Sequence, residues 1–136
     1  MKRHFFVPGD PMGKQRVRVA NGHAYTPQKT REYEETIRFF YEAQCHYEPY
    51  PKGTALGLTI IALFRIPKGA SKKTMQGMLS GAIKPTVKPD ADNIAKVLDA
   101  VNKAAWFDDC QITDLHVKKR YALEPGLDVY ITEDDE

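Results

Sequence analysis

The sequence predicts one α+β domain, in which helices pack against a mixed β-sheet. Its 136 residues are the usual size of a single domain, and no repeat or linker divides them. Short β-favouring segments and segments of helical periodicity follow one another along the chain. We therefore expect one domain over residues 1–136, of which 132–136 form an acidic, flexible tail.

The N-terminal segment predicts a strand followed by a hairpin. Residues 4–7 are β-favouring and stop at a Pro-Gly pair. Residues 16–25 surround Asn21-Gly22, which is a strong two-residue turn signal. Because side chains alternate between the two faces of a strand, Arg16 and Arg18 are expected on the same face.

Helical periodicity predicts a first long helix at about residues 31–47. Thr26, followed by Pro27, or alternatively Thr30 would cap its start. Its inner face would be formed by Tyr33, Ile37, Phe40, Tyr41 and Gln44. Three glutamates would occupy the first turn, where the helix dipole favours acids: Glu32, Glu34 and Glu35.

The second half predicts a central strand, two helices and two final strands. Residues 56–66 are apolar at both alternating sets of positions, as in a strand buried on both faces. Ser71 would cap a short helix. The clearest helix is expected over 93–104, with an apolar face formed by Ile94, Val97, Leu98 and Val101. Strands are expected at about 111–122 and 127–132.

Composition excludes several classes of protein. The chain is 42% hydrophobic and 28% charged, unlike a disordered or low-complexity protein. No apolar run approaches the about 20 residues that cross a membrane, and the N-terminal run is too short for a secretion signal. Two cysteines are a poor disulfide framework. We therefore expect a cytoplasmic protein without a membrane partner.

The net charge of +2 conceals a segregation of charge along the chain. Residues 1–31 and 66–89 are strongly basic, whereas residues 90–114 hold six aspartates against two lysines. Basic flanks around an acidic centre suit a protein that holds a polyanion and binds a cation in the middle. Ordinary solvated surface charge is the alternative.

The residues between 88 and 111 carry the candidate chemistry. Asp90 and Asp92 are expected to be extended ahead of the helix, with both carboxylates on one side. Their repulsion becomes tolerable if a hard cation such as Mg²⁺ lies between them. Lys96 follows Asp92 by one helical turn. If the chain turns back after the helix, Asp109 would join them, and the group would be typical of metal-assisted phosphodiester cleavage.

Simpler explanations of these residues remain open. Asp90 or Asp92 would cap the helix, Asp99 would form an ion pair with Lys96, and Asp114 would face solvent. The histidines and cysteines lack zinc-site spacing, and neither a glycine-rich phosphate loop nor a complete EF-hand loop is present. From spacing alone, a metallonuclease and an accidental acidic loop are both possible.

Two spaced motifs make the pattern more specific. They are Lys88-Pro89-Asp90-Ala91-Asp92-Asn93-x-x-Lys96 and Trp106-x-Asp108-Asp109-x-Gln111-Ile112. Together with Pro8, the basic stretch 14–18 and Tyr25-Thr26-Pro27, they resemble the RusA family of Holliday-junction resolvases. One departure is Asn102-Lys103, where many relatives have Asn-Gly.

The resemblance implies a RusA-like domain that acts as a crossover junction endodeoxyribonuclease. Asp90, Asp92 and Asp109 match the metal-binding, catalytic aspartates, and Lys96 matches the catalytic lysine. Mg²⁺, or Mn²⁺ in its place, would be the cofactor, with no small-molecule cofactor. Family members are homodimers that nick four-way DNA junctions symmetrically during recombination and repair. Many are encoded by phages or prophages, which implies a bacterial cytoplasm.

Basic residues would bind the phosphates of the DNA. The candidates are Lys14, Arg16, Arg18, Lys72, Lys73, Lys84, Lys88, Lys118, Lys119 and Arg120. The dimer interface would draw on Phe39, Phe40, Ile61 and Leu63. Three alternatives stay open: a nuclease for other branched DNA such as flaps, a non-catalytic DNA-binding module, and a structural phage protein.

Overall fold

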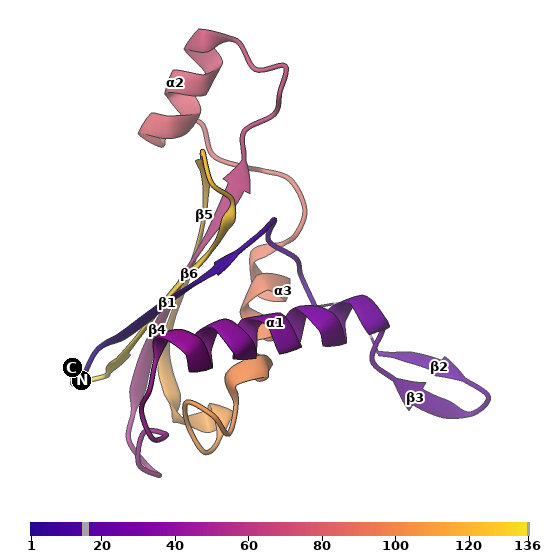
Figure 1. Cartoon of the computed structure of the whole chain (residues 1–136), viewed down its shortest axis with the longest axis vertical. Coiled ribbons are helices and arrows are strands. Elements are labelled where there is room, and N and C mark those ends of the chain that lie inside the picture. Colours follow the sequence, from indigo (N-terminus) through magenta and orange to yellow (C-terminus); the bar gives the residue numbers. More distant parts are fainter. Residues whose placement is uncertain (15–16, 136) are drawn as a thin grey trace.

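The computed structural model describes residues 1–14 and 17–135, apart from the side chain of Val97. Four strands form one sheet in the order β1-β6-β4-β5 (Figure 1). They are β1 (Arg3–Pro8), β4 (Leu56–Arg65), β5 (Ile112–Ala122) and β6 (Gly126–Glu133). β6 is antiparallel to β1 and β4, whereas β5 is parallel to β4. The predicted α+β fold with a mixed sheet is confirmed.

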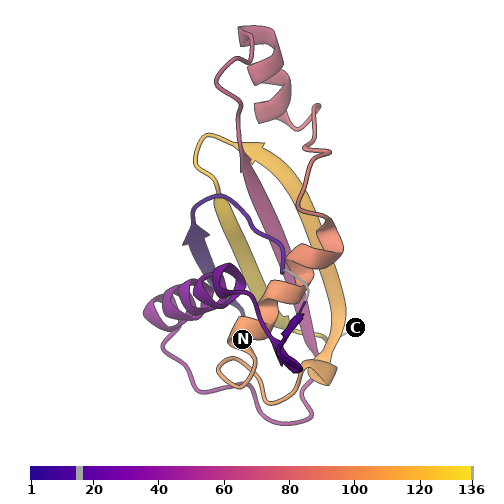
Figure 2. The same cartoon turned by 90° about the vertical axis from the view of Figure 1, so that its right-hand side faces the viewer.

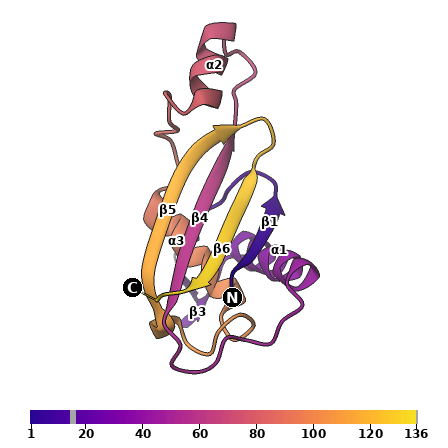
Figure 3. The ribbon, with the colours of Figure 1, turned by 90° about the vertical axis from the view of Figure 1, so that its left-hand side faces the viewer.

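The helices that form the core lie on one face of the sheet. They are α1 (Gln28–Gln44), α3 (Ala91–Lys96) and the 3₁₀ segment η1 (Val97–Val101), all in front of the strands in Figure 2. Within the described chain the opposite face is left open (Figure 3). α2 (Lys72–Ser80) projects beyond the sheet, and the 3₁₀ turn η2 (Asp109–Gln111) precedes β5.

The hairpin predicted around Asn21-Gly22 is present. Its strands are β2 (Arg18–Ala20) and β3 (His23–Tyr25), and Asn21 and Gly22 both have positive φ, as such a turn requires. The hairpin lies beyond the start of α1, and all its strand residues are exposed (Figure 1). Arg16 falls outside the described residues, so its expected position beside Arg18 is not described.

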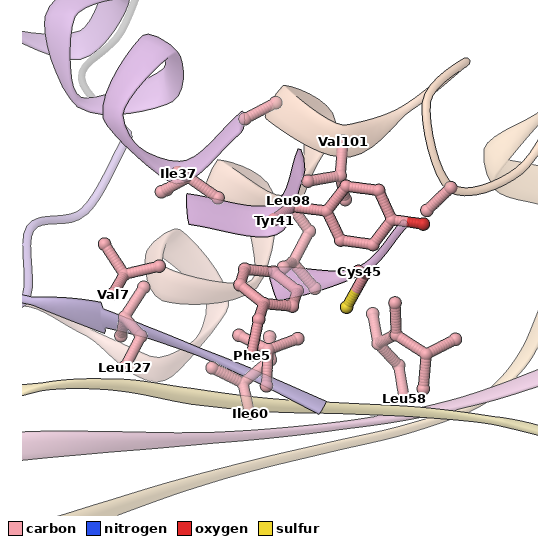
Figure 4. Packing of buried hydrophobic residues seen from close by; sticks show 14 of the residues in the cluster. Phe5, Val7, Ile37, Tyr41, Cys45, Leu58, Ile60, Leu98, Val101 and Leu127 are labelled. Carbon is pink, nitrogen blue, oxygen red and sulfur yellow. The ribbon is translucent and has the colours of Figure 1, made fainter. Parts of the chain in front are cut away.

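The hydrophobic core fills the space between the sheet and α1, α3 and η1 (Figure 4). The ring of Phe5 meets that of Tyr41 edge-on, with centroids 5.3 Å apart. Leu58 and Ile60 of β4 point into the same space and are fully buried, as is Ile37 of α1. Each such side chain stabilises the fold by about 1.5–3 kcal/mol relative to an exposed one.

The first long helix starts and ends earlier than the sequence predicts. α1 begins at Gln28 after Pro27, so Thr26 does not cap it, and Thr30 is buried inside it. The first turn contains no acid, because the earlier start moves the three glutamates into later turns. The helix ends at Gln44, and the N–H of the next residue, Cys45, donates to the Tyr41 carbonyl at 2.7 Å. Thr30, Ile37 and Tyr41 are the buried residues of α1. Their burial determines where the helix begins and ends, and it outweighs the local preference for a threonine cap.

The second long helix is shorter than predicted. α3 begins at Ala91 and ends at Lys96, after which the chain tightens into η1. Ile94, Leu98 and Val101 are buried as predicted, whereas the Val97 side chain lies outside the described part. The Arg38 guanidinium donates a hydrogen bond of 2.7 Å to the Ala100 carbonyl. This side-chain bond gives the carbonyl a partner other than a helical N–H group.

Two further predictions need correction, and one is confirmed. β4 is buried on one face only, because the residues that alternate with Leu58 and Ile60 lie on the open face of the sheet. Thr132 and Glu133 of the expected tail belong to β6, and the Asp134 N–H donates to the Ala55 carbonyl. Ser71 caps α2 as predicted, accepting from the Thr74 N–H at 3.2 Å.

Among the described helices, none is both long and apolar enough to cross a membrane.

Candidate active site

An open cavity of about 920 Å³ lies beside α3. We call it the Asp90 cavity; its lining is Lys14, Val17, Arg18, Asp90, Asp92, Asn93 and Lys96. The structure thus brings two of the three predicted aspartates together with the predicted lysine. It adds cations from the segment before the hairpin and from the hairpin itself.

Asp90 and Asp92 reach the cavity from the start of α3. The Asp90 carbonyl accepts from the N–H groups of Asn93 and Ile94 at 3.1 and 3.0 Å, which begins the helix. Asp92 lies in the first helical turn, so the expected extended arrangement of both residues is wrong for Asp92. The Asp90 carboxylate lies 3.1 Å from the Lys88 ammonium, and both side chains are at least half exposed. Such a pair contributes little to stability and exchanges easily with another partner.

Lys96 lies one helical turn after Asp92 and faces the same cavity, as predicted. Asp99 does not pair with Lys96. Its carboxylate lies instead 2.9 Å from the Lys14 ammonium, which comes from the N-terminal segment. This pairing joins residues 85 positions apart, so local spacing does not reveal it.

Lys14 is held against α3 by its backbone as well as its side chain. Its N–H donates to the Asn93 carbonyl at 3.2 Å. Hydrogen bonding to Asp99 raises the pKa of Lys14, with further support from the charges of Asp99, Glu34 and Asp109 and against the effect of burial. Burial raises the pKa of Glu34, and the charges of Lys14 and Arg38 oppose this. Lys14 therefore forms an ion pair with Asp99, and the charges of Glu34 and Asp109 act on it more weakly.

Asp109 lies on η2, where a buried side chain orients it. The Trp106 indole N–H donates to Asp109 Oδ1 at 2.8 Å. The neighbouring Asp108 has a different role, because its carboxylate caps η2 by accepting from the Cys110 N–H, which lowers the pKa of Asp108. Trp106 belongs to the second sequence motif, but the motif alone assigns it no role; its position three residues before Asp109 is the signal that points to one.

Asp109 is not gathered with the other two aspartates. In the part of the chain that the structure describes, no three Asp, Glu, His or Cys side chains lie close enough to hold a metal ion together. Asp109 does lie near enough to Lys14 for its charge to raise the Lys14 pKa. The expected single cup of three carboxylates is therefore not formed among the described residues: two carboxylates line the Asp90 cavity, and Asp109 lies on η2, outside that lining.

The predicted DNA-binding residues occupy several surfaces. Lys72 and Lys73 begin the projecting helix α2, and the Lys84 ammonium donates to the Gly81 carbonyl. The run 118–120 alternates between the faces of β5. Lys119 lies on the helix-bearing face, with its ammonium bonded to the Val87 carbonyl, whereas Lys118 and Arg120 point to the open face.

The apolar residues predicted for a dimer interface do not form one surface. Phe39 is 64% exposed on α1, and Phe40 packs against the core. Ile61 and Leu63 are half-buried on the open face of the sheet, on the other side of the molecule from α1.

The fold and the site together define an α+β protein with a carboxylate-bearing cavity flanked by cations, an arrangement suited to a polyanionic substrate. The family model described as Endodeoxyribonuclease RusA matches residues 8–132, and the chain belongs to this family of nucleases. A relative, "Uncharacterized protein YqaN" of Bacillus subtilis (strain 168), is 33% identical over 137 residues. The match covers 95% of this chain and 94% of the relative.

Proposed function

We propose that this protein is a Mg²⁺-dependent endodeoxyribonuclease that resolves four-way DNA junctions by paired, symmetric nicks. The observation that carries the proposal is the Asp90 cavity, in which two carboxylates and Lys96 face the same open space in a chain of the RusA family. Cations at the rim of this cavity suit a DNA strand as the substrate.

The residues of the Asp90 cavity fit a hard divalent cation. Mg²⁺ is usually held by one or two carboxylates, while water and substrate phosphate complete its coordination. Asp90 and Asp92 would supply those carboxylates for Mg²⁺ or Mn²⁺. Since the three aspartates do not lie within reach of one ion in the structure, we propose that Asp109 joins them as a further ligand only when the metal is bound. When bound, the metal would lower the pKa of water and stabilise charge on the phosphate.

The remaining residues would position the DNA strand. Lys96 would offset the charge that develops on the scissile phosphate, since it shares the cavity with both aspartates. Arg18 would bind a flanking phosphate from the hairpin. Lys88 would leave Asp90 and bind a DNA phosphate instead, because the ion pair between Lys88 and Asp90 is exposed and weak. The other basic candidates, including Arg16, would extend this contact along the junction arms.

We also propose that the active form is a homodimer. A four-way junction has two-fold character, and two symmetric nicks require two related active sites. Analytical ultracentrifugation would give twice the chain mass for the dimer.

The decisive experiment is cleavage of an end-labelled four-way junction with and without Mg²⁺. We expect paired nicks that need the metal. Asp92→Asn should lower the rate by about a hundredfold or more, because metal catalysis supplies several kcal/mol of transition-state stabilisation. Asp114→Asn is the matched control, since Asp114 is an exposed aspartate of β5 outside the cavity lining. Equal rates for Asp92→Asn and the wild type would reject the assignment.

Other substrates separate the remaining alternatives. Faster cutting of flaps than of four-way junctions would indicate a nuclease for other branched DNA. Salt-sensitive junction binding without metal-dependent cleavage would indicate a non-catalytic DNA-binding module. Weak binding that hardly changes with salt would indicate a structural protein.

A further inference from the structure

A second cavity, of about 560 Å³, opens next to Asp109. We call it the Phe107 cavity. Its walls include Lys52 from the loop before β4, together with Lys103, Phe107 and Asp108 from the segment that leads to η2. Asp108 directly precedes Asp109, so the cavity begins one residue from the third proposed catalytic aspartate. None of Lys52, Lys103 and Phe107 has a role in the site described above.

Lys103 occupies an unusual backbone position on this cavity. Its φ is +74°, in the left-handed region that glycine adopts without cost but other residues disfavour. Its ammonium donates to the Phe107 carbonyl, which places the positive charge at the cavity wall. A glycine would adopt this φ with less strain, so the backbone conformation does not explain the lysine. What the lysine side chain adds is the hydrogen bond to the Phe107 carbonyl and a cation at the cavity wall.

Phe107 and Lys52 complete a surface that suits a nucleotide. Phe107 is 38% exposed, whereas the neighbouring Trp106 is fully buried. The Lys52 ammonium lies 5.3 Å from the centre of the Phe107 ring. An exposed ring accepts a stacked base, and two nearby ammonium groups accept a phosphate.

We propose that the Phe107 cavity binds one unpaired nucleotide of the DNA strand, with its phosphate between Lys52 and Lys103 and its base against Phe107. The nucleotide is part of the same DNA that the Asp90 cavity would cut, so this inference rests on the proposed function. Asp108 contributes a negative charge to the wall, which would keep the phosphate on the lysine side.

Fluorescence anisotropy of junction binding in EDTA tests the phosphate contact without requiring cleavage. Lys103→Gly should weaken binding by about three- to tenfold and lower the slope of log K against log salt by about 0.9, as expected for one lost phosphate contact. Its melting temperature should stay within a few degrees of the wild type, because glycine relieves the strain at φ +74° while the hydrogen bond from Lys103 to the Phe107 carbonyl is lost. Lys2→Gln is the control, since the Lys2 ammonium lies over Tyr130, away from the cavity.

A second variant tests the base contact. A junction with 2-aminopurine unpaired at the branch point should lose fluorescence on binding the wild type, and lose much less on binding Phe107→Leu. Wild-type affinity and salt slope in Lys103→Gly, or wild-type quenching in Phe107→Leu, would overturn the proposal. A wild type that binds in this way but does not cleave would reject the proposed function alone. Tight binding of a free nucleoside monophosphate, and none of DNA, would also overturn it.

Discussion

The indole N–H of Trp106 donates a hydrogen bond of 2.8 Å to Oδ1 of Asp109. Trp106 is fully buried, whereas Asp109 is exposed, so a rigid core residue sets the orientation of a surface carboxylate. Trp106 is also the one tryptophan of the chain. Its fluorescence therefore reports directly on the state of Asp109.

Metal binding at Asp109 should change the fluorescence of Trp106. We expect Mn²⁺ to quench the emission in a saturable way, because a metal on the carboxylate lies within a few ångströms of the indole. In Asp109→Asn the amide still accepts from the indole but carries no charge, so saturable quenching should be lost. Asp114→Asn should respond as the wild type does. Identical titrations in Asp109→Asn and the wild type would show that Asp109 is not a ligand.

Gly13→Ala should detach the Lys14 segment from α3. A β-carbon at Gly13 would lie 2.9 Å from Asn93 Cβ and 3.0 Å from Pro89 Cβ, which is too close without movement. Overpacking of this kind costs about 1–3 kcal/mol, measurable by thermal or urea unfolding. Gly69→Ala is the matched control, because Gly69 has no neighbour within 4 Å and no positive φ. Equal stability of the two variants would contradict this close packing.

The β2–β3 hairpin should be dispensable for folding but needed for DNA binding. Arg18 faces Tyr25 in register, so Gly-Gly can replace residues 18–25 and join the flanking chain. We expect a melting temperature within a few degrees of the wild type, since the strand residues are exposed. Junction affinity and its salt dependence should both fall. A large loss of stability would show that the hairpin supports the fold instead.

Alkaline pH should destabilise the fold through Tyr33. Burial raises the pKa of Tyr33 from 10.0 to about 12, with partial opposition from the Met12 backbone. Because the folded-state pKa exceeds the unfolded one, the stability is fully present below pH 10 and declines as pH rises toward 12. Two pKa units correspond to about 2.7 kcal/mol. Denaturant unfolding between pH 9 and 12 measures this loss.

Tyr33→Phe should reduce that alkaline slope and leave stability at pH 7 unchanged or slightly higher. The Tyr33 hydroxyl is buried and forms no hydrogen bond of normal geometry among the described residues, although the Met12 backbone lies near enough to lower its pKa, so its removal sacrifices only a weak contact. Some slope should remain, because burial also raises the pKa of Tyr41 and Tyr50, and the Lys14–Asp99 pair is lost as Lys14 deprotonates. An unchanged slope in Tyr33→Phe would exclude Tyr33 as the cause.

Local patterns predicted most of the secondary structure. The Asn21-Gly22 turn and the Ser71 cap each depend on neighbouring residues, and both appear as expected. Helix limits were less predictable. Pro27 and the core-facing side of α1 displaced its start from the threonine caps, because burial outweighs a cap worth about 1 kcal/mol.

The sequence by itself determined the family resemblance and the residues with metal-binding and phosphate-binding chemistry, because both lie in short motifs. Only the tertiary structure decided their grouping. It pairs Lys14 with Asp99, and it orients the Asp109 carboxylate by a hydrogen bond from Trp106. It also covers one face of β4 and leaves the other face open. Such relationships depend on how distant segments pack, and contacts between distant segments leave no periodic signal in the chain.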